Sequence, residues 1–212
     1  MNSDIMAEKL IIFDLDGTLY KTEEVSVPAL KEAFSTFGIE LTEEKILEQF
    51  GEPTDQIIDN LVPGSNKIEK EKIEKAIVEK EREAIPERAV LYEGVKELLK
   101  TLSDDGHILA ICSNGRYDYI EDVLKNTSIR EYFSSIKGYS EETNKSDRIK
   151  DIMGEFSVEE AVMVGDRYHD IEAAKEAGIV SIGALYGYGD QEAKKADHKA
   201  EKPIDILSIL MD

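Results

Sequence analysis

Residues 9–18 of the chain read KLIIFDLDGT, and this segment carries the strongest fold signal in the sequence. It begins with a nearly continuous apolar run and turns polar abruptly at Asp14. A short apolar run of this kind predicts a strand that is buried on both faces, as in a parallel sheet. Asp14 and Asp16 stand where that strand ends, and Gly17 and Thr18 follow them.

Three further apolar runs predict three more strands. These runs cover residues 107–112, 161–164 and 180–185, and helical patterns separate them. Strands that alternate with helices indicate an α/β fold with right-handed crossovers. We therefore expect a Rossmann-like, doubly wound parallel sheet.

The chain between the first two predicted strands carries only helical patterns. Within it, residues 66–84 repeat Glu and Lys at helical spacing. We expect this charge run to be a solvated helix face. The sequence thus predicts a helical domain at residues 21–88, inserted after the first strand into a core domain made of residues 1–20 and 89–212.

The composition restricts the partners and the compartment. The 212 residues carry a formal net charge of −20, which repels nucleic-acid backbones and anionic membrane surfaces. The one cysteine, Cys112, lies in a predicted buried strand and has no second cysteine to pair with. Residues 1–6 show no signal-peptide pattern, and no apolar run approaches the ~20 residues of a membrane helix. We expect a cytoplasmic protein, either a monomer or a small homo-oligomer.

Polar segments follow the predicted strands in a regular way. They occupy residues 14–18, 113–115 and 165–170, and Lys145 opens the helix that precedes the last of them. In an open α/β sheet, ligands bind beyond the carboxyl ends of the strands. We therefore expect these segments to converge on one crevice.

Taken in order, these four segments resemble the four sequence motifs of the haloacid dehalogenase-like (HAD) hydrolase superfamily. Residues 165–179, GDRYHDIEAAKEAGI, followed by GYG at 187–189, are especially similar to phosphoglycolate-phosphatase-like members. The helical insert resembles their C1-type cap. The resemblance spans Lys9 to about Gly189 and implies a Mg²⁺-dependent phosphatase of a small phosphorylated metabolite. It favours phosphoglycolate, while nucleoside monophosphates, sugar phosphates and pyrophosphate stay open.

The first motif offers two carboxylates with separate tasks. Asp14 can attack phosphorus and form an aspartyl-phosphate, which divides one difficult displacement into two. Asp16 can protonate the leaving oxygen and then deprotonate the attacking water. Mg²⁺ prefers hard oxygen ligands, which Asp14, the backbone carbonyl of Asp16 and Asp166 would supply. The resemblance adds Asp170 as a metal ligand, directly or through water.

The remaining motif residues are predicted to hold the phosphate. Ser113 offers a hydroxyl, and Asn114 and Gly115 offer backbone or side-chain donors, to the phosphate oxygens; Thr18 is assigned to the same task. Lys145 would neutralise charge on the transferred phosphoryl group and pair with Asp14.

Some assignments stay open at this point. Lys137 competes with Lys145 for the role of the motif lysine. We expect His169 to point away from the site, although it neighbours Asp170. At the cap and the adjoining loop near Tyr20, the candidates for contacting the leaving group are Tyr20, Glu52 and Thr54. A carboxylate at Glu52 would discourage a second anionic group, which weakens the case for phosphoglycolate.

Two other functions compete with a phosphatase. Asp16 argues against dehalogenation and phosphonate hydrolysis, since the superfamily members with those activities lack an aspartate there. Sugar-phosphate mutases with similar caps often carry valine where this chain has Thr18, so a mutase is the weaker alternative. A non-catalytic, receiver-like phosphate-binding module would also combine a strand-end aspartate, Mg²⁺ and a lysine, but it would lack the DxDGT turn and the helical insert.

Overall fold

The structure is a computed structural model that describes residues 9–211. Its centre is one parallel sheet with the strand order β3-β2-β1-β4-β5-β6. The strands are β1 (Leu10–Phe13), β2 (Ile108–Cys112), β3 (Phe133–Lys137), β4 (Ala161–Gly165), β5 (Val180–Ala184) and β6 (His198–Ala200). The strand order reverses between β1 and β4, so the fold places its ligand crevice beyond the carboxyl ends of these two strands.

Helices cover both faces of the sheet. They are α5 (Val95–Asp104), α6 (Tyr117–Asn126), α7 (Lys145–Phe156), α8 (Tyr168–Ala177), α9 (Asp190–Ala193) and α10 (Asp205–Met211), with a 3₁₀ turn, η1, at Arg130–Tyr132. Side chains of α5, α6 and α10 pack with Ile11 and Phe13 of β1. Those of α7 and α8 pack with Leu10 and Ile12. Successive β1 residues therefore enter opposite cores, as expected for a strand that is buried on both faces.

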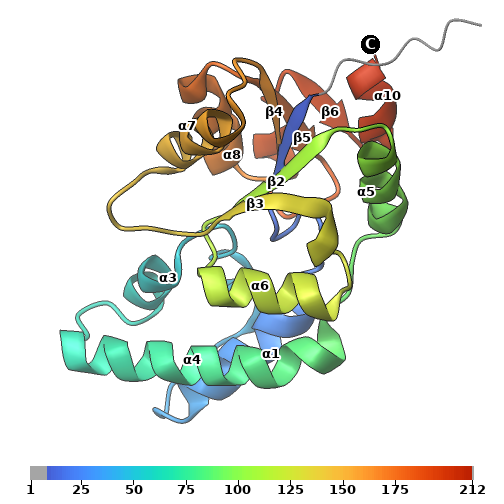
Figure 1. Cartoon of the computed structure of the whole chain (residues 1–212). Helices are drawn as coiled ribbons and strands as arrows, with labels where there is room; N and C mark the ends of the chain where they lie inside the picture. Colours follow the sequence, from blue (N-terminus) through green and yellow to red (C-terminus); the bar gives the residue numbers. More distant parts are fainter. Residues whose placement is uncertain (1–8, 212) are drawn as a thin grey trace, which may run out of the picture.

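A helical domain lies between β1 and α5. It consists of α1 (Glu23–Ser35), α2 (Glu43–Leu47), α3 (Thr54–Leu61) and α4 (Lys67–Arg88). Asn66 caps α4 through a reciprocal capping box with Glu69. The domain has its own apolar core, which includes Phe34, Ile58 and Ile77. Figure 1 shows α1, α3 and α4 gathered together on one side of the molecule, with α6 beside them. We call this unit the cap.

The α/β class and the four sequence-predicted strands are confirmed, with boundaries shifted by one residue at most. The sequence did not predict β3 and β6, which form the two edges of the sheet. Edge strands have one open side and tolerate polar residues, and neither FSSIK nor HKA contains a long apolar run. Cys112 is buried in β2, as predicted. Within residues 9–211, no helix has the length and apolar character that crossing a bilayer requires.

Candidate active site

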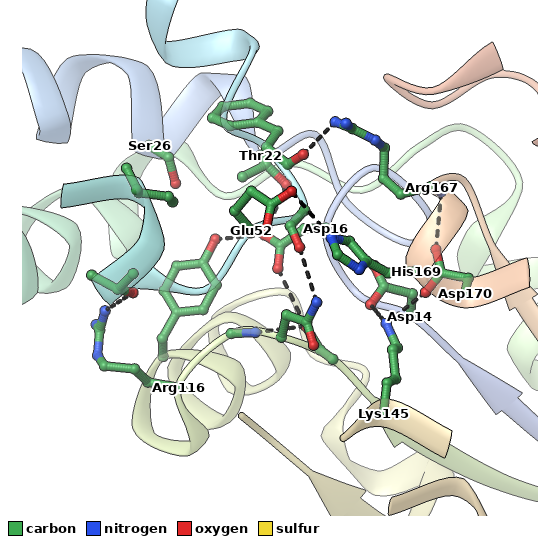
Figure 2. Close-up of a pocket in the computed structure, with 18 of the residues that line it drawn as sticks. Asp14, Asp16, Thr22, Ser26, Glu52, Arg116, Lys145, Arg167, His169 and Asp170 are labelled. Carbon is green, nitrogen blue, oxygen red and sulfur yellow. Dashed lines mark hydrogen bonds and ion pairs between the residues drawn. The ribbon is translucent and has the colours of Figure 1, made fainter. Parts of the chain in front are cut away.

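Four charged side chains meet beyond the carboxyl ends of β1 and β4. The Lys145 Nζ atom lies 2.7 Å from Asp14 Oδ1 and 2.5 Å from Asp170 Oδ1. Asp14, Asp166 and Asp170 each place a carboxylate oxygen within 4.8 Å of the other two. All four residues are buried, and Figure 2 shows Lys145 pointing toward Asp14 and Asp170. The predicted pairing of Lys145 with Asp14 is therefore present.

Two glycines make room for this cluster. Gly17 has a φ of +74°, and a Cβ atom there would come within 2.6 Å of Asp166 Oδ2. A Cβ atom on Gly165 would meet Asp170 Cγ at 2.2 Å. A side chain at either position would push a carboxylate out of place. The glycines of the DxDGT and GDxxxD segments thus allow the close approach of the carboxylates.

The start of α7 places Lys145 at the cluster. The Asn144 side chain accepts a hydrogen bond from the Asp147 N–H at 2.8 Å and caps the helix, so Lys145 is its first residue. Lys137 lies on β3, where its Nζ atom pairs with Glu155 at 2.5 Å. Of the two lysines that the sequence left in competition, Lys145 is the one that reaches Asp14.

Asp16 faces the same pocket but is held separately from the other carboxylates. Its Oδ1 atom accepts hydrogen bonds from the Tyr119 hydroxyl at 2.8 Å and from the Thr22 hydroxyl at 2.9 Å. The Ser113 hydroxyl lies 3.5 Å from Asp16 Oδ2. These contacts orient the Asp16 carboxylate within the pocket that Asp14 also lines.

The loop after β2 lines another part of the pocket. Ser113, Asn114 and Gly115 all border it, and the Gly115 N–H donates to the Ser113 hydroxyl at 3.0 Å. The Asn114 amide group has other partners: it donates to the Gly51 carbonyl of the cap at 3.0 Å and accepts from Arg148 at 2.7 Å. Ser113 is thus placed to meet a ligand, the Gly115 N–H is held by the Ser113 hydroxyl, and the Asn114 side chain ties the loop to the cap.

Thr18 and Tyr20, like Asp166, do not border the pocket, although the sequence predicted all three as site residues. Thr18 is fully buried, and its hydroxyl lies 3.5 Å from Asp166 Oδ1. Tyr20 is also fully buried, with its hydroxyl against that of Tyr119. Both side chains lie beneath the pocket: Thr18 supports Asp166, and Tyr20 supports the tyrosine that holds Asp16.

The cap contributes the opposite wall. Glu52 and Thr54 border the pocket, as expected. The Glu52 Oε1 atom lies 3.1 Å from His169 Nε2, and Thr54 accepts a hydrogen bond from Arg116 at 3.2 Å. The prediction that His169 points away is wrong, because the first turn of α8 faces the cap directly across the crevice.

Comparison with known proteins places this geometry in a family. A family model described as haloacid dehalogenase-like hydrolase matches residues 11–184, which is most of the chain. The chain belongs to this family. As a haloacid dehalogenase-like hydrolase it is an enzyme of the phosphatase type, like the relatives that resemble it over nearly their whole length.

Two relatives and one solved structure illustrate the similarity. A phosphoglycolate phosphatase from Vibrio vulnificus is 30% identical over 220 residues, with 96% of each chain covered. Pyrophosphatase PpaX from Listeria monocytogenes is 29% identical over 212 residues, with 95% of this chain and 96% of that one covered. The crystal structure titled "predicted phosphoglycolate phosphatase" from Haemophilus somnus is 26% identical and has a TM-score of 0.88, covering 95% of this chain and 97% of that chain.

Burial governs the electrostatics of this hydrolase. Burial raises the pKa of Asp14 well above its usual range; the charge of Lys145 opposes this shift, while the neighbouring carboxylates add to it. Burial also raises the pKa of Asp16, against the hydrogen bonds from Tyr119 and Thr22. For Lys145, burial alone lowers the pKa, but the carboxylates of Asp14 and Asp170 more than offset it and the pKa is raised. The two carboxylates therefore favour the charged form of Lys145.

The carboxylate cluster suits a divalent cation. Asp14, Asp166 and Asp170 offer hard oxygen donors, which Mg²⁺ prefers. The Asp16 side chain is not part of that trio, and its expected contribution was a backbone carbonyl. Burial first, and the charge of Asp170 second, raise the pKa of Asp166 to about 7. A cation at this place would offset the repulsion between the carboxylates.

The pocket residues that the sequence did not predict include Arg116, Tyr119 and Glu81. Arg116 and Tyr119 follow the Ser113–Gly115 segment, and their place at the start of the next helix was a usable signal. Glu81 had no such signal. It belongs to the charge run that we expected to be solvated, yet it is 7% exposed.

We expect the metal-free protein to lose stability as the pH rises from about 5.5 to about 7.5. An aspartate in the unfolded chain has a pKa of about 3.9, whereas Asp166 titrates near 7 in the fold. Between these values the folded state binds the extra proton, so rising pH destabilises it until about pH 7. This single group accounts for about 2 kcal/mol over that window. Urea unfolding at the two pH values measures the difference.

The pH effect has two internal controls. Metal binding needs deprotonated carboxylates, so saturating Mg²⁺ should remove most of the decline. In the absence of Mg²⁺, Asp166→Asn should remove a large part of the decline in stability. A metal-free protein that is equally stable at both pH values would contradict the repulsion described for this cluster.

Proposed function

We propose that this chain is a Mg²⁺-dependent phosphomonoester hydrolase that acts on a small phosphorylated metabolite through an aspartyl-phosphate at Asp14. The observation that carries the proposal is the geometry around Asp14: a carboxylate paired with Lys145 at 2.7 Å, beside two further aspartates at the switch point of the sheet. The family match and the phosphatase names of the relatives support the same reaction type.

The proposed reaction has two steps. In the first, an Asp14 oxygen attacks phosphorus, the bond from phosphorus to the alcohol oxygen breaks, and Asp16 gives its proton to that oxygen. In the second, Asp16 takes a proton from water, which attacks phosphorus and releases phosphate and the free Asp14 carboxylate. The raised pKa of Asp16 suits an acid that must be protonated when substrate arrives.

The other residues bind and orient the phosphoryl group. Lys145 holds Asp14 in place and balances negative charge on the phosphoryl oxygens. Ser113, whose hydroxyl accepts a hydrogen bond from the Gly115 N–H, borders the pocket and would offer that hydroxyl to those oxygens. Mg²⁺ held by Asp14, Asp166 and Asp170 would supply positive charge between the carboxylates and the phosphoryl group.

Asp16→Asn should slow turnover by about a hundred- to ten-thousand-fold. An amide cannot protonate the leaving oxygen or accept a proton from water. With an activated ester such as p-nitrophenyl phosphate, the first step needs little acid assistance, so the aspartyl-phosphate should accumulate. Acid-quenched protein mass spectrometry measures the bound phosphoryl group. Unchanged steady-state kinetics would reject the acid/base role.

The function itself is tested by Mg²⁺-dependent hydrolysis of p-nitrophenyl phosphate. We expect release of nitrophenol that EDTA abolishes and added Mg²⁺ restores. A protein that takes up phosphate once and never turns over would favour the receiver-like module, and one that interconverts sugar phosphates would favour the mutase. The substrate panel starts with phosphoglycolate and pyrophosphate, for which the relatives are named.

A further inference from the structure

Arg116 lies on the far side of the pocket from the reacting carboxylate. Figure 2 shows Arg116 and Ser26 opposite Lys145 and Asp14, across the space that the substrate must enter. The phosphoryl group belongs beside Asp14 in the proposed function. The leaving group therefore points toward Arg116 and the cap, and this end of the pocket determines which alcohol fits.

An arginine at this position would normally select an anion. Its planar guanidinium binds a carboxylate or phosphate through two parallel hydrogen bonds. Here part of that capacity is occupied: Nη2 lies 2.8 Å from Glu81 Oε2, and Nη1 donates to Thr54 at 3.2 Å. The Nε atom lies 3.4 Å from Asp118 Oδ1 but has no hydrogen-bond partner. The guanidinium thus faces two carboxylates before any substrate binds.

Glu81 is placed inside the protein. Its side chain is 9% exposed, and that of Arg116 is 19% exposed. Burial raises the pKa of Glu81 and the charge of Arg116 lowers it. A buried carboxylate is costly without a partner, so Glu81 and Arg116 hold each other. A substrate carboxylate could use Arg116 only by leaving Glu81 buried and unpaired.

The other cations that line the pocket are engaged as well. Arg167 pairs with Glu192 at 2.9 Å and donates to the Phe50 carbonyl. Lys145 pairs with Asp14 and Asp170. Among the pocket residues that the structure describes, every lysine and arginine already faces a carboxylate. A second negative charge on the leaving group would have to compete with these carboxylates for a cation.

Hydroxyl groups and carboxylate acceptors surround the same space. The hydroxyls belong to Ser26, Thr22, Thr54 and Tyr119, and apolar contact comes from Leu30, Phe50 and Ile57. Glu81 and Glu52 also border the pocket, and a carboxylate can accept more than one hydrogen bond, including one from an alcohol group. These groups complement a leaving group that is uncharged and carries hydroxyls.

We propose that the substrate is the phosphate monoester of a neutral, hydroxyl-bearing alcohol, and that Glu81 excludes substrates with a second anionic group by neutralising Arg116. This inference rests on the proposed hydrolase function. Such a substrate differs from those in the names of the two relatives described above. Phosphoglycolate carries a carboxylate, and pyrophosphate carries a second phosphate.

Matched substrate pairs test the proposal. The first pair is 2-hydroxyethyl phosphate and 2-phosphoglycolate, and the second is glycerol 3-phosphate and 3-phosphoglycerate. In each pair a CH₂OH group replaces a carboxylate at almost the same size. We expect the wild-type enzyme to prefer the neutral member by about tenfold or more in kcat/KM.

Glu81→Gln keeps the shape of the side chain and removes its charge. It should shift the kcat/KM ratio toward the carboxylate member of each pair by about tenfold. Glu79→Gln changes the net charge equally at an exposed position of the same helix and should leave the ratio unchanged. Thermal melts establish that the variants are folded. The kcat/KM ratio of the wild-type enzyme tests the substrate preference without any variant.

The outcomes separate the specificity from the reaction. If p-nitrophenyl phosphate is hydrolysed but the wild-type enzyme prefers the carboxylate substrates, the specificity proposal is overturned and the hydrolase stands. A folded Glu81→Gln enzyme with the wild-type ratio would overturn the role of Glu81. If no phosphoester is hydrolysed in the presence of Mg²⁺, both proposals fail.

Discussion

Asp14→Asn is expected to lower kcat for p-nitrophenyl phosphate by at least about a thousand-fold. The amide nitrogen and oxygen of asparagine are poor nucleophiles. Asp170, the other carboxylate that pairs with Lys145, lies on α8 and not directly after β1, so it does not replace Asp14. The fold should survive, because burial and the neighbouring carboxylates already disfavour the Asp14 charge. A neutral amide therefore removes repulsion while it leaves Lys145 paired with Asp170.

The control for this variant is a surface aspartate. Asp190 pairs with Lys194 at the start of α9, with half of its side chain exposed, and Asp190→Asn should keep wild-type kinetics. Near-ultraviolet circular dichroism establishes that both variants are folded. Turnover by Asp14→Asn within tenfold of the wild-type rate would remove the proposed nucleophile.

Lys145→Met should damage both stability and catalysis. The ammonium lies between the buried carboxylates of Asp14 and Asp170, and Met fills similar volume without charge. Removing one partner of a buried ion pair costs about 3–5 kcal/mol, which corresponds to a fall in Tm of roughly 10 °C for a chain of this size. Activity should fall by about a hundred-fold or more, since charge on the phosphoryl group is no longer balanced.

Lys137→Met provides the matched comparison. Lys137 was the competing motif lysine, and it pairs with Glu155 at the sheet edge with 31% of its side chain exposed. A partly exposed pair contributes about 0–1 kcal/mol, so this variant should keep nearly wild-type Tm and kcat. Should Lys137→Met lose activity while Lys145→Met keeps it, the assignment of the lysine would be reversed.

The central strands were predictable because burial on both faces leaves a continuous apolar signal. β1 and β2 show such runs, and the polar residues that follow them mark the crevice directly. Because the carboxyl ends of neighbouring parallel strands meet at one edge, the positions of Asp14 and Ser113 relative to each other followed from the strand assignment. Edge strands β3 and β6 lack this signal, since one of their sides is open.

The cap side of the site was much less predictable. Helical spacing shows which residues share a face of α4, but it does not show where the cap sits over the sheet. Glu81 therefore looks like its charged neighbours in sequence, although the fold buries it against Arg116, 35 residues further along the chain. His169 was misjudged for the same reason, because its partner Glu52 comes from the cap loop.

Direct detection of the phosphorylated aspartate tests the central claim most closely. Asp16→Asn protein is mixed with p-nitrophenyl phosphate and Mg²⁺, quenched in acid, digested with pepsin and examined by tandem mass spectrometry. We expect one added phosphoryl group on the peptide that contains residues 10–18, localised to Asp14, and none after the same treatment of an Asp14→Asn, Asp16→Asn double variant. A phosphoryl group on any other residue, or wild-type turnover without any labelled protein in either form, would contradict it.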